Sequence, residues 1–205
     1  MIIKSFPSGP LSVNCYFVGD DITKKAFIVD PGGFNSRLDN YIKENAYSLD
    51  YIILTHGHSD HIGGVKAYQE AYNAKIIAHK DDASMLAHAA DNFSLQVYGK
   101  AIAFEADIYI PEITRLSVGT MALEFIHTPG HTPGGMCVLV ENHLFTGDTL
   151  FFESIGRTDF PGSSFDALAL SVHNKLFILP DETLVYPGHM GETTIGHEKN
   201  FNPFV

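Results

Sequence analysis

The apolar residues of the chain follow two patterns, one of short continuous runs and one of longer stretches with a spacing of three or four. Short runs rich in β-branched and aromatic residues predict buried strands. They cover residues 24–30, 51–54, 75–79, 121–126, 136–140 and 183–186. The spacing of three or four predicts helices with one apolar face. Such helices are expected over residues 34–46, from near Asp60 to Tyr72, and from Phe165 to Leu179, where Ser163 and Asp166 resemble a capping pair.

Strands are followed by helices in both halves of the chain, which predicts an α/β (α+β) protein with two sheets packed face to face and helices outside. At 205 residues, with no heptads or long linkers, we expect one domain over 1–205. Residues 91–109 show weak periodicity, and we expect them to be partly helical and to lie near a functional site. Asn92, Phe93 and Tyr98 are candidates for substrate contact there, with packing as the alternative for the two aromatics.

Four side chains that bind metals lie within six residues, in the segment that follows the strand at 51–54. They are His56, His58, Asp60 and His61. Neutral imidazole and carboxylate groups are the donors that hold zinc, iron or manganese in proteins. The segment joins the carboxyl end of a strand to the start of a helix, which is where open α/β sheets bind their ligands. We therefore expect a metal site at this position.

Three further donors follow other predicted strands, each flanked by Gly or Pro. They are His131, Asp148 and His189. Taken singly, each has an ordinary alternative as a turn residue, a helix cap or a loop histidine. Taken together with the first segment they give five His and two Asp, all at strand ends, and this set favours one shared metal site.

This donor set resembles that of the metallo-β-lactamase superfamily of binuclear hydrolases. The resemblance runs nearly end to end, since Asn14–Tyr16 and Asp30–Gly33 resemble the early strands of that fold. It implies a four-layer αβ/βα sandwich. Within the superfamily the chain is similar to the short glyoxalase II-like proteins, in segments 147–151, 156–162, 179–183 and 202–204. Longer glyoxalase II enzymes carry an additional C-terminal helical region that binds glutathione, and we expect none after His189.

The resemblance leads to a hypothesis for catalysis by two divalent ions, with zinc expected and iron or manganese as alternatives. One ion would be held by His56, His58 and His131, the other by Asp60, His61 and His189, and Asp148 would bridge them. Asp60 and Asp148 would thus serve catalysis, in which a metal-bridging hydroxide attacks a carbonyl. A small-molecule thioester is the expected substrate, because a thiol with a pKa near 8.5 leaves without a strong acid. No Gly-x-Ser-x-Gly nucleophile segment competes with this mechanism.

Arg157 is the candidate for binding a substrate carboxylate, and pairing with Asp159 or Asp148 is its structural alternative. Persulfide dioxygenases, which use one iron, are similar to this chain over residues 156–160. They typically have Cys where this chain has Ile155, which favours hydrolysis. Lactone hydrolysis and metal binding without turnover are the remaining alternatives.

Composition limits the classes of partner that we expect for this protein. The net charge of −11 argues against nucleic-acid binding, which depends on Lys and Arg contacts to phosphate. No apolar run approaches the roughly 18 residues of a membrane-spanning helix, and no signal peptide is visible, so we expect a cytoplasmic protein. Cys15 and Cys137 lie in apolar runs and are expected to be buried reduced thiols. The sequence leaves the oligomeric state open.

Overall fold

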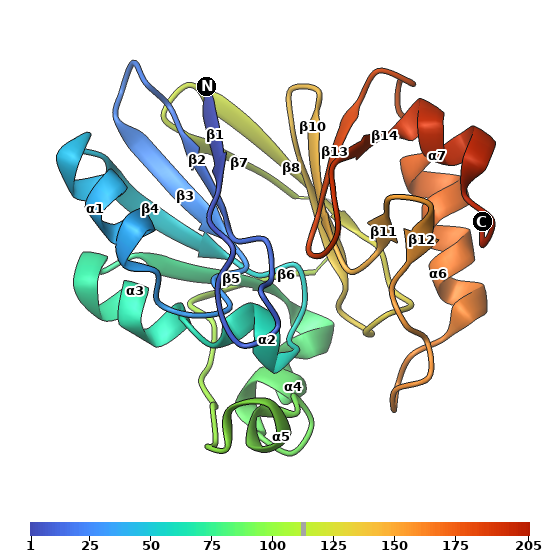
Figure 1. Cartoon of the computed structure of the whole chain (residues 1–205), viewed down its shortest axis with the longest axis horizontal. Helices are drawn as coiled ribbons and strands as arrows, with labels where there is room; N and C mark the ends of the chain where they lie inside the picture. Colours follow the sequence, from blue (N-terminus) through green and yellow to red (C-terminus); the bar gives the residue numbers. More distant parts are fainter. Residues whose placement is uncertain (112–113) are drawn as a thin grey trace.

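Two six-stranded β-sheets pack face to face, and helices cover the outer side of each sheet (Figure 1). The computed structural model describes residues 1–111 and 114–205. Successive residues of one strand face opposite sides of the sheet and so belong to different apolar layers. Ile28 faces the outer helices, whereas its neighbours Phe27 and Val29 face the other sheet. A third apolar cluster lies between the second sheet and the C-terminal helices. The predicted αβ/βα sandwich is therefore confirmed.

The first sheet contains the N-terminal strands in sequence order. They are β1 (Ile2–Ser5), β2 (Tyr16–Gly19), β3 (Lys25–Val29), β4 (Ser48–Ile53), β5 (Lys75–His79) and β6 (Ile108–Ile110). The first three pair antiparallel, and β3 to β6 pair parallel. Parallel pairing brings the carboxyl ends of β3, β4 and β5 to the same edge of the sheet, from which the segment with the first four predicted ligands emerges.

The second sheet has the order β14-β13-β10-β9-β8-β7. Its strands are β7 (Thr114–Val118), β8 (Met121–His127), β9 (Met136–Val140), β10 (His143–Gly147), β13 (Leu184–Pro187) and β14 (Thr193–Thr194). A small hairpin of β11 (Leu150–Phe151) and β12 (Ser154–Ile155) follows β10. The six strands predicted from apolar runs are all present, with ends that differ by at most three residues.

Helices cover the two outer faces and surround one end of the sandwich (Figure 1). They are α1 (Ser36–Glu44), α2 (Ser59–Ile62), α3 (Val65–Tyr72), the 3-10 turn at Lys80–Asp82, α4 (Ala83–Ala87), α5 (Ser94–Tyr98), α6 (Phe165–Ser171) with a π-helical turn at Val172–Leu176, and α7 (Ile195–Phe201). Residues 91–109 contain α5, loops and the start of β6, so the prediction of a partly helical segment is confirmed.

The single helix predicted from Asp60 to Tyr72 is wrong, because the chain forms two helices separated by Gly63 and Gly64. A Cβ atom on Gly64 would lie only 2.6 Å from the carbonyl carbon of Gly33. The N–H of Gly64 donates to the carbonyl of Pro31 at 2.7 Å. The close approach of this other loop replaces the hydrogen bonds of a continuous helix, and sequence periodicity carries no sign of it.

The predicted capping pair of the helix at 165 is also wrong by one residue. Ser164 is the N-cap, and its side chain accepts a hydrogen bond from the N–H of Ala167. Ser163 instead donates to the carbonyl of Phe160, which closes the preceding turn. Both candidate serines precede the helix, and only the geometry of the turn decides between them.

Cys15 and Cys137 are both buried and free, as expected, and they belong to different apolar clusters. Burial raises the pKa of the Cys137 thiol to about 11, so it stays protonated at neutral pH. Over the described ranges, the helices are too short and too polar to cross a bilayer.

Candidate metal centre

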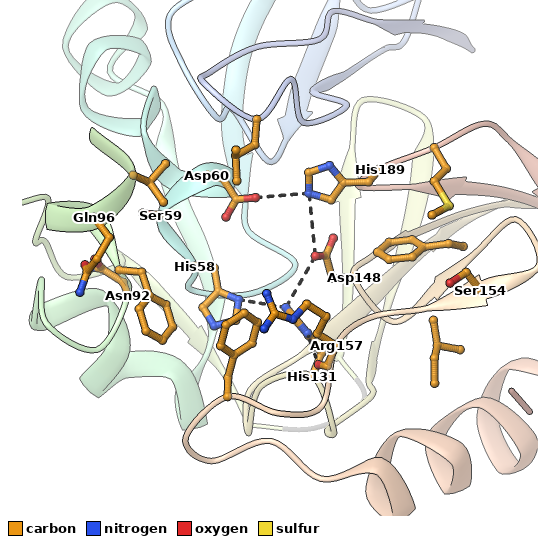
Figure 2. Close-up of a pocket in the computed structure, with 17 residues that line it drawn as sticks. His58, Ser59, Asp60, Asn92, Gln96, His131, Asp148, Ser154, Arg157 and His189 are labelled. Carbon is orange, nitrogen blue, oxygen red and sulfur yellow. Dashed lines mark hydrogen bonds and ion pairs between the residues drawn. The ribbon is translucent and has the colours of Figure 1, made fainter. Parts of the chain in front are cut away.

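The seven predicted metal ligands meet at one edge of the sandwich, between the two sheets. The first sheet supplies the four that follow β4, and the second sheet supplies the other three from the loops after β8, β10 and β13. Figure 2 shows five of them, facing a common space: His58, Asp60, His131, Asp148 and His189. Donors separated by up to 129 positions along the chain are thus in contact.

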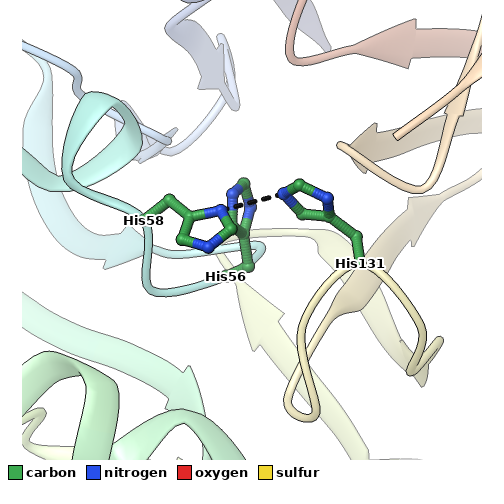
Figure 3. A group of neighbouring side chains, drawn as sticks. All are labelled: His56, His58 and His131. Atoms are coloured by element: carbon green, nitrogen blue, oxygen red, sulfur yellow. Dashed lines mark hydrogen bonds between the residues drawn. The ribbon is translucent and has the colours of Figure 1, made fainter. Parts of the chain in front are cut away.

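Three histidines form the first group, and Figure 3 shows their rings converging from two loops. Ligand atoms of His56, His58 and His131 lie within 4.8 Å of one another. The Nδ1 atom of His58 is 2.9 Å from Nε2 of His131. All three rings are almost fully buried, and their donor atoms lie close enough together for all three rings to bind one cation.

The second group contains one carboxylate and two imidazoles. Ligand atoms of Asp60, His61 and His189 again lie within 4.8 Å of one another. An Asp60 oxygen is 3.2 Å from Nε2 of His189 and 3.6 Å from Nε2 of His61. Helix α2 presents Asp60 and His61 from adjacent positions, while His189 approaches from the opposite sheet.

Asp148 lies between the two groups. One of its carboxylate oxygens is 3.3 Å from Nε2 of His61, and the other is 3.6 Å from Nε2 of His131. The same second oxygen is 3.9 Å from Nε2 of His189. Asp148 therefore contacts members of both groups, which is the position of a bridging carboxylate.

Three buried atoms of this cluster have no hydrogen-bond partner, namely Nε2 of His56, Nε2 of His61 and Oδ1 of Asp148. An unsatisfied buried polar atom costs about 1–3 kcal/mol, and native structures contain few of them. Their clustering among nitrogen and carboxylate donors fits divalent metal ions, which accept lone pairs from these two atom types. The buried His and Asp groups are therefore suited to hold metal ions.

Hydrogen bonds from outside the cluster hold the rings in place. Nδ1 of His61 contacts a carboxylate oxygen of Asp30 at 2.9 Å, and Nδ1 of His131 contacts the carbonyl of Arg157 at 2.7 Å. The Thr55 hydroxyl is 3.1 Å from Nδ1 of His56 and donates to Asp30 at 2.6 Å. With Nδ1 engaged, each of these rings turns Nε2 toward the cluster, as outer partners of metal-binding histidines do.

A second buried carboxylate, Asp82, joins the loops that carry the two groups of ligands. Its oxygens accept hydrogen bonds from the N–H of Gly57 at 3.0 Å, the N–H of Gly134 at 2.7 Å and the hydroxyl of Thr132 at 2.8 Å. Asp82 and the roles of Asp30 and Thr55 were not predicted from the sequence. Asp30 had a usable signal, because it ends a predicted strand and is followed by Pro-Gly-Gly, and most of the predicted ligands are also flanked by Gly or Pro.

Electrostatics hold the cluster in a state ready to bind cations. Burial and the neighbouring His131 ring lower the pKa of His58 to about 3, and burial lowers the pKa of His56 well below its usual value. Burial of Asp148 is outweighed by His61, and the pKa of that carboxyl falls below its usual range. At neutral pH these groups are neutral imidazoles and an ionised carboxylate, the protonation states that bind metals.

His61 differs from the other rings, because three carboxylates surround it. Burial opposes its charged form, but Asp148, Asp60 and Asp30 outweigh burial and raise the pKa of His61 well above its usual value. The three carboxylates therefore favour a positive charge near them, as they would also favour a metal cation bound beside His61.

Three residues of segment 91–109 were candidates for substrate contact. The polar groups of two of them form hydrogen bonds within the protein, and the third lines the pocket. The amide of Asn92 donates to the carbonyls of Met85 and Ile102, and its oxygen accepts from the N–H of Ser94. The hydroxyl of Tyr98 donates to the carbonyl of Gly32. Both polar groups thus hold loops together. Phe93 lines the pocket in front of the cluster.

Arg157 adopts its structural alternative. Its guanidinium group forms two hydrogen bonds with Asp159, at 2.9 and 2.7 Å, and lies 4.3 Å over the ring of Phe160. It lines the pocket (Figure 2), while its carbonyl orients His131. The pocket has a volume of about 580 Å³, which is within the range of small-molecule sites.

A smaller cluster of His79, Asp81 and His127 has a packing role. The two rings stack at 3.8 Å, and their Nε2 atoms contact the carbonyls of Pro111 and Pro133. Donor atoms of the cluster lie within 4.8 Å of one another, but both Nε2 atoms are already engaged by carbonyls, so fewer donors are free than in the main site.

Proteins of known sequence share this architecture. The chain is similar to the probable metallo-hydrolase YqgX of Bacillus subtilis, with 37% identity over 98% of this chain and 96% of that protein. It is also similar to the hydroxyacylglutathione hydrolase GloC of Haemophilus influenzae, with 35% identity over 100% of this chain and 98% of that protein.

Solved structures agree with these relatives. The B3 metallo-β-lactamase BLEG-1 superposes with a TM-score of 0.93 at 38% identity and covers 99% of both chains. TTHA1623 in a di-iron-bound form superposes with a TM-score of 0.84 at 31% identity, over 98% of this chain and 100% of that one. The sequence profile of the metallo-β-lactamase superfamily matches residues 8–189, which include all seven predicted ligands. The chain belongs to the metallo-β-lactamase superfamily.

Proposed function

We propose that this protein is a metal-dependent hydrolase of thioesters with a binuclear site of the glyoxalase II type. The observation that carries the proposal is the set of unpartnered buried atoms on His56, His61 and Asp148, which spans both groups of donors. A single ion would leave one group of donors unsatisfied. The similarity to a hydroxyacylglutathione hydrolase and to a probable metallo-hydrolase supports the same reaction class.

Each residue of the cluster has a role in this proposal. His56, His58 and His131 would hold the first ion, Asp60, His61 and His189 the second, and Asp148 both. When bound, the ions supply Lewis acidity and a water of lowered pKa.

The protein's own groups fix the geometry in which that chemistry takes place. Asp30 and the carbonyl of Arg157 hold the ligand rings, and the pocket in front of them orients the substrate carbonyl. The expulsion of a thiol with a pKa near 8.5 needs no strong acid from the protein. Arg157 is already paired with Asp159, so the proposal assigns it no part in the departure of the thiol.

We propose zinc as the resident metal, with iron as the direct competitor. Apart from the bridging Asp148, the six proposed ligands are five imidazoles and one carboxylate, donors that both metals accept. A similar protein has been solved in a di-iron-bound form. Metal analysis of the purified protein decides between them, and about two ions per chain are expected.

The decisive experiment combines metal content with turnover of a panel of thioesters that includes S-lactoylglutathione. Asp148→Asn keeps the shape of the side chain and removes its charge, so at least one ion and most turnover should be lost. Asp166→Asn is the matched control, since Asp166 is exposed on α6 and is not part of the pocket lining. A fully metallated and fully active Asp148→Asn protein would contradict the bridging role. A metallated wild type inactive on every thioester would contradict the reaction class.

Oxygen chemistry is a second candidate with one observation in its favour. Asp60, His61 and His189 form a group of two imidazoles and one carboxylate, which is the donor set of mononuclear iron oxygenases. Oxygen uptake with glutathione persulfide tests it. One iron per chain together with rapid uptake would replace hydrolysis as the function.

A further inference from the structure

Two large apolar side chains of the pocket stand on strained backbone. Phe93 has φ of 63° and Met190 has φ of 67°, in the left-handed region that disfavours residues with a Cβ atom. Both line the pocket in front of the metal groups. Among the described non-glycine residues with positive φ they are the two with large aromatic or aliphatic side chains. Such strain persists where the surrounding structure demands a particular side-chain position, and it concentrates at binding sites.

Aromatic rings form the wall of the pocket next to the first group of ligands. The ring centroids of Phe93 and Phe160 are 5.2 Å apart, and they lie 5.5 and 5.1 Å from the ring of His58. The strained backbone of Phe93 thus positions an aromatic surface directly beside a ligand of the cluster. A substrate whose carbonyl is at the metal groups must pass over this surface.

Most of the surface that lines the pocket is apolar. It includes Leu11, Val97, Phe151 and Ile155, and Met190 projects from the loop that carries His189. Leu11 and Met190 are 55% and 61% exposed, so large apolar area at the rim is open to a ligand. Burial of such area by a substrate is favourable, at roughly fourfold in affinity for each methylene group.

The described lining offers little positive charge to an anionic substrate. Arg157 is the only Lys or Arg side chain there, and Asp159 already engages it through two hydrogen bonds. The amide of Asn92 is likewise used within the protein. A carboxylate placed in the pocket would have to share the guanidinium of Arg157 with Asp159, whose negative charge weakens the attraction for a second anion.

We infer that the site selects thioesters with an apolar, uncharged acyl chain, and that Phe93 and Met190 are specificity-determining residues that contact this chain. The inference rests on the proposed thioester hydrolysis and narrows its substrate class. In the reaction, water adds to the acyl carbon, the C–S bond breaks, and the products are a carboxylic acid and a thiol that takes up a proton.

The test uses acyl thioesters of N-acetylcysteamine, a small neutral thiol, so that the leaving group is constant while the acyl chain grows from two to ten carbons. In the metallated wild type, kcat/KM should rise by roughly fourfold for each methylene until the pocket is filled. S-lactoylglutathione, with its two carboxylates, should be a worse substrate than the octanoyl thioester.

Two alanine variants test whether Phe93 and Met190 cause the dependence on chain length. Phe93→Ala and, independently, Met190→Ala should lower kcat/KM by a factor that grows with chain length. Leu95→Ala is the matched control, because Leu95 lies two residues after Phe93 on α5, is 52% exposed and is not part of the lining. Its chain-length profile should equal that of the wild type. Thermal unfolding verifies that each variant is folded.

The outcomes separate the two levels of the argument. Hydrolysis with a flat profile, or with S-lactoylglutathione preferred over every acyl chain, overturns the inference and leaves thioester hydrolysis intact. A rising profile that both pocket variants retain overturns the assignment to Phe93 and Met190. A metallated protein inactive on all thioesters overturns the proposed function and the inference together.

Discussion

Gly188 offers a sharp test of the metal site, because its missing side chain makes room for two proposed ligands. A Cβ atom at this position would lie 2.6 Å from a carboxylate oxygen of Asp148 and 2.6 Å from the Cε1 atom of His61. Ordinary contacts begin at 3.4 Å, so Gly188→Ala forces a displacement of roughly 0.8 Å. The backbone cannot easily yield, since its N–H donates to Gly147 and its carbonyl accepts from Asn14, both at 2.8 Å. A misplacement on the order of 1 Å costs about 100-fold in catalysis.

We therefore expect Gly188→Ala to remain folded, to bind metal about 10–100-fold more weakly and to lose about 100-fold in kcat/KM. Competition with a chelating dye measures the first quantity, and thioester hydrolysis measures the second. Gly191→Ala is the matched control on the same loop, because a Cβ atom there meets no atom within 4 Å. Wild-type metal affinity and turnover in Gly188→Ala would refute the assignment of Asp148 and His61 as neighbouring ligands.

Three further predictions concern stability. Asp82→Asn should lower the free energy of unfolding in urea by about 2 kcal/mol, because an amide cannot accept from all three buried donors, whereas the exposed Asp81→Asn should change it by less than about 0.5 kcal/mol. Leu38→Ala, at a fully buried position, should cost about 3 kcal/mol in the same assay. Burial and His127 lower the pKa of His79, so the folded state binds fewer protons there than the unfolded chain, and stability is lost as pH falls through about 6.5. Between pH 8 and pH 5, His79→Asn should therefore lose less free energy of unfolding in urea than the wild type loses. An equal loss in the two proteins would contradict this reasoning.

The sequence predicted which donors converge better than it predicted what holds them in place. Each predicted ligand follows a strand, and strand ends on the same side of two packed sheets must meet, so the seven side chains could be grouped without coordinates. The contacts of Asp30 and Asp82 span 25 or more positions and depend on how separate loops approach. A buried aspartate without a repeating pattern has no periodic signal, and its partners become visible only in the folded chain.

Local rules failed where two segments compete for the same backbone groups. Helical periodicity runs through Gly63 and Gly64, yet the loop at Pro31 accepts the N–H of Gly64 and ends the continuity between α2 and α3. The break has a functional consequence, because α2 is then a short, separate helix whose orientation is set by the loops around the site. Asp60 and His61 are positioned by that contact rather than by a long helix.

The two buried aspartates outside the ligand set explain how a site built from both sheets keeps its shape. Asp30 connects His61 to Thr55 within the first sheet, and Asp82 connects the loop of Gly57 to the turn that carries His131 in the second. The N–H of Met136 also donates to the carbonyl of Thr55 at 2.8 Å, which joins the two sheets directly beside the cluster. The positions of the donors are therefore determined by hydrogen bonds that do not involve a metal. Metal binding to such a preorganised site need not order the loops, so most of its free energy remains available for affinity.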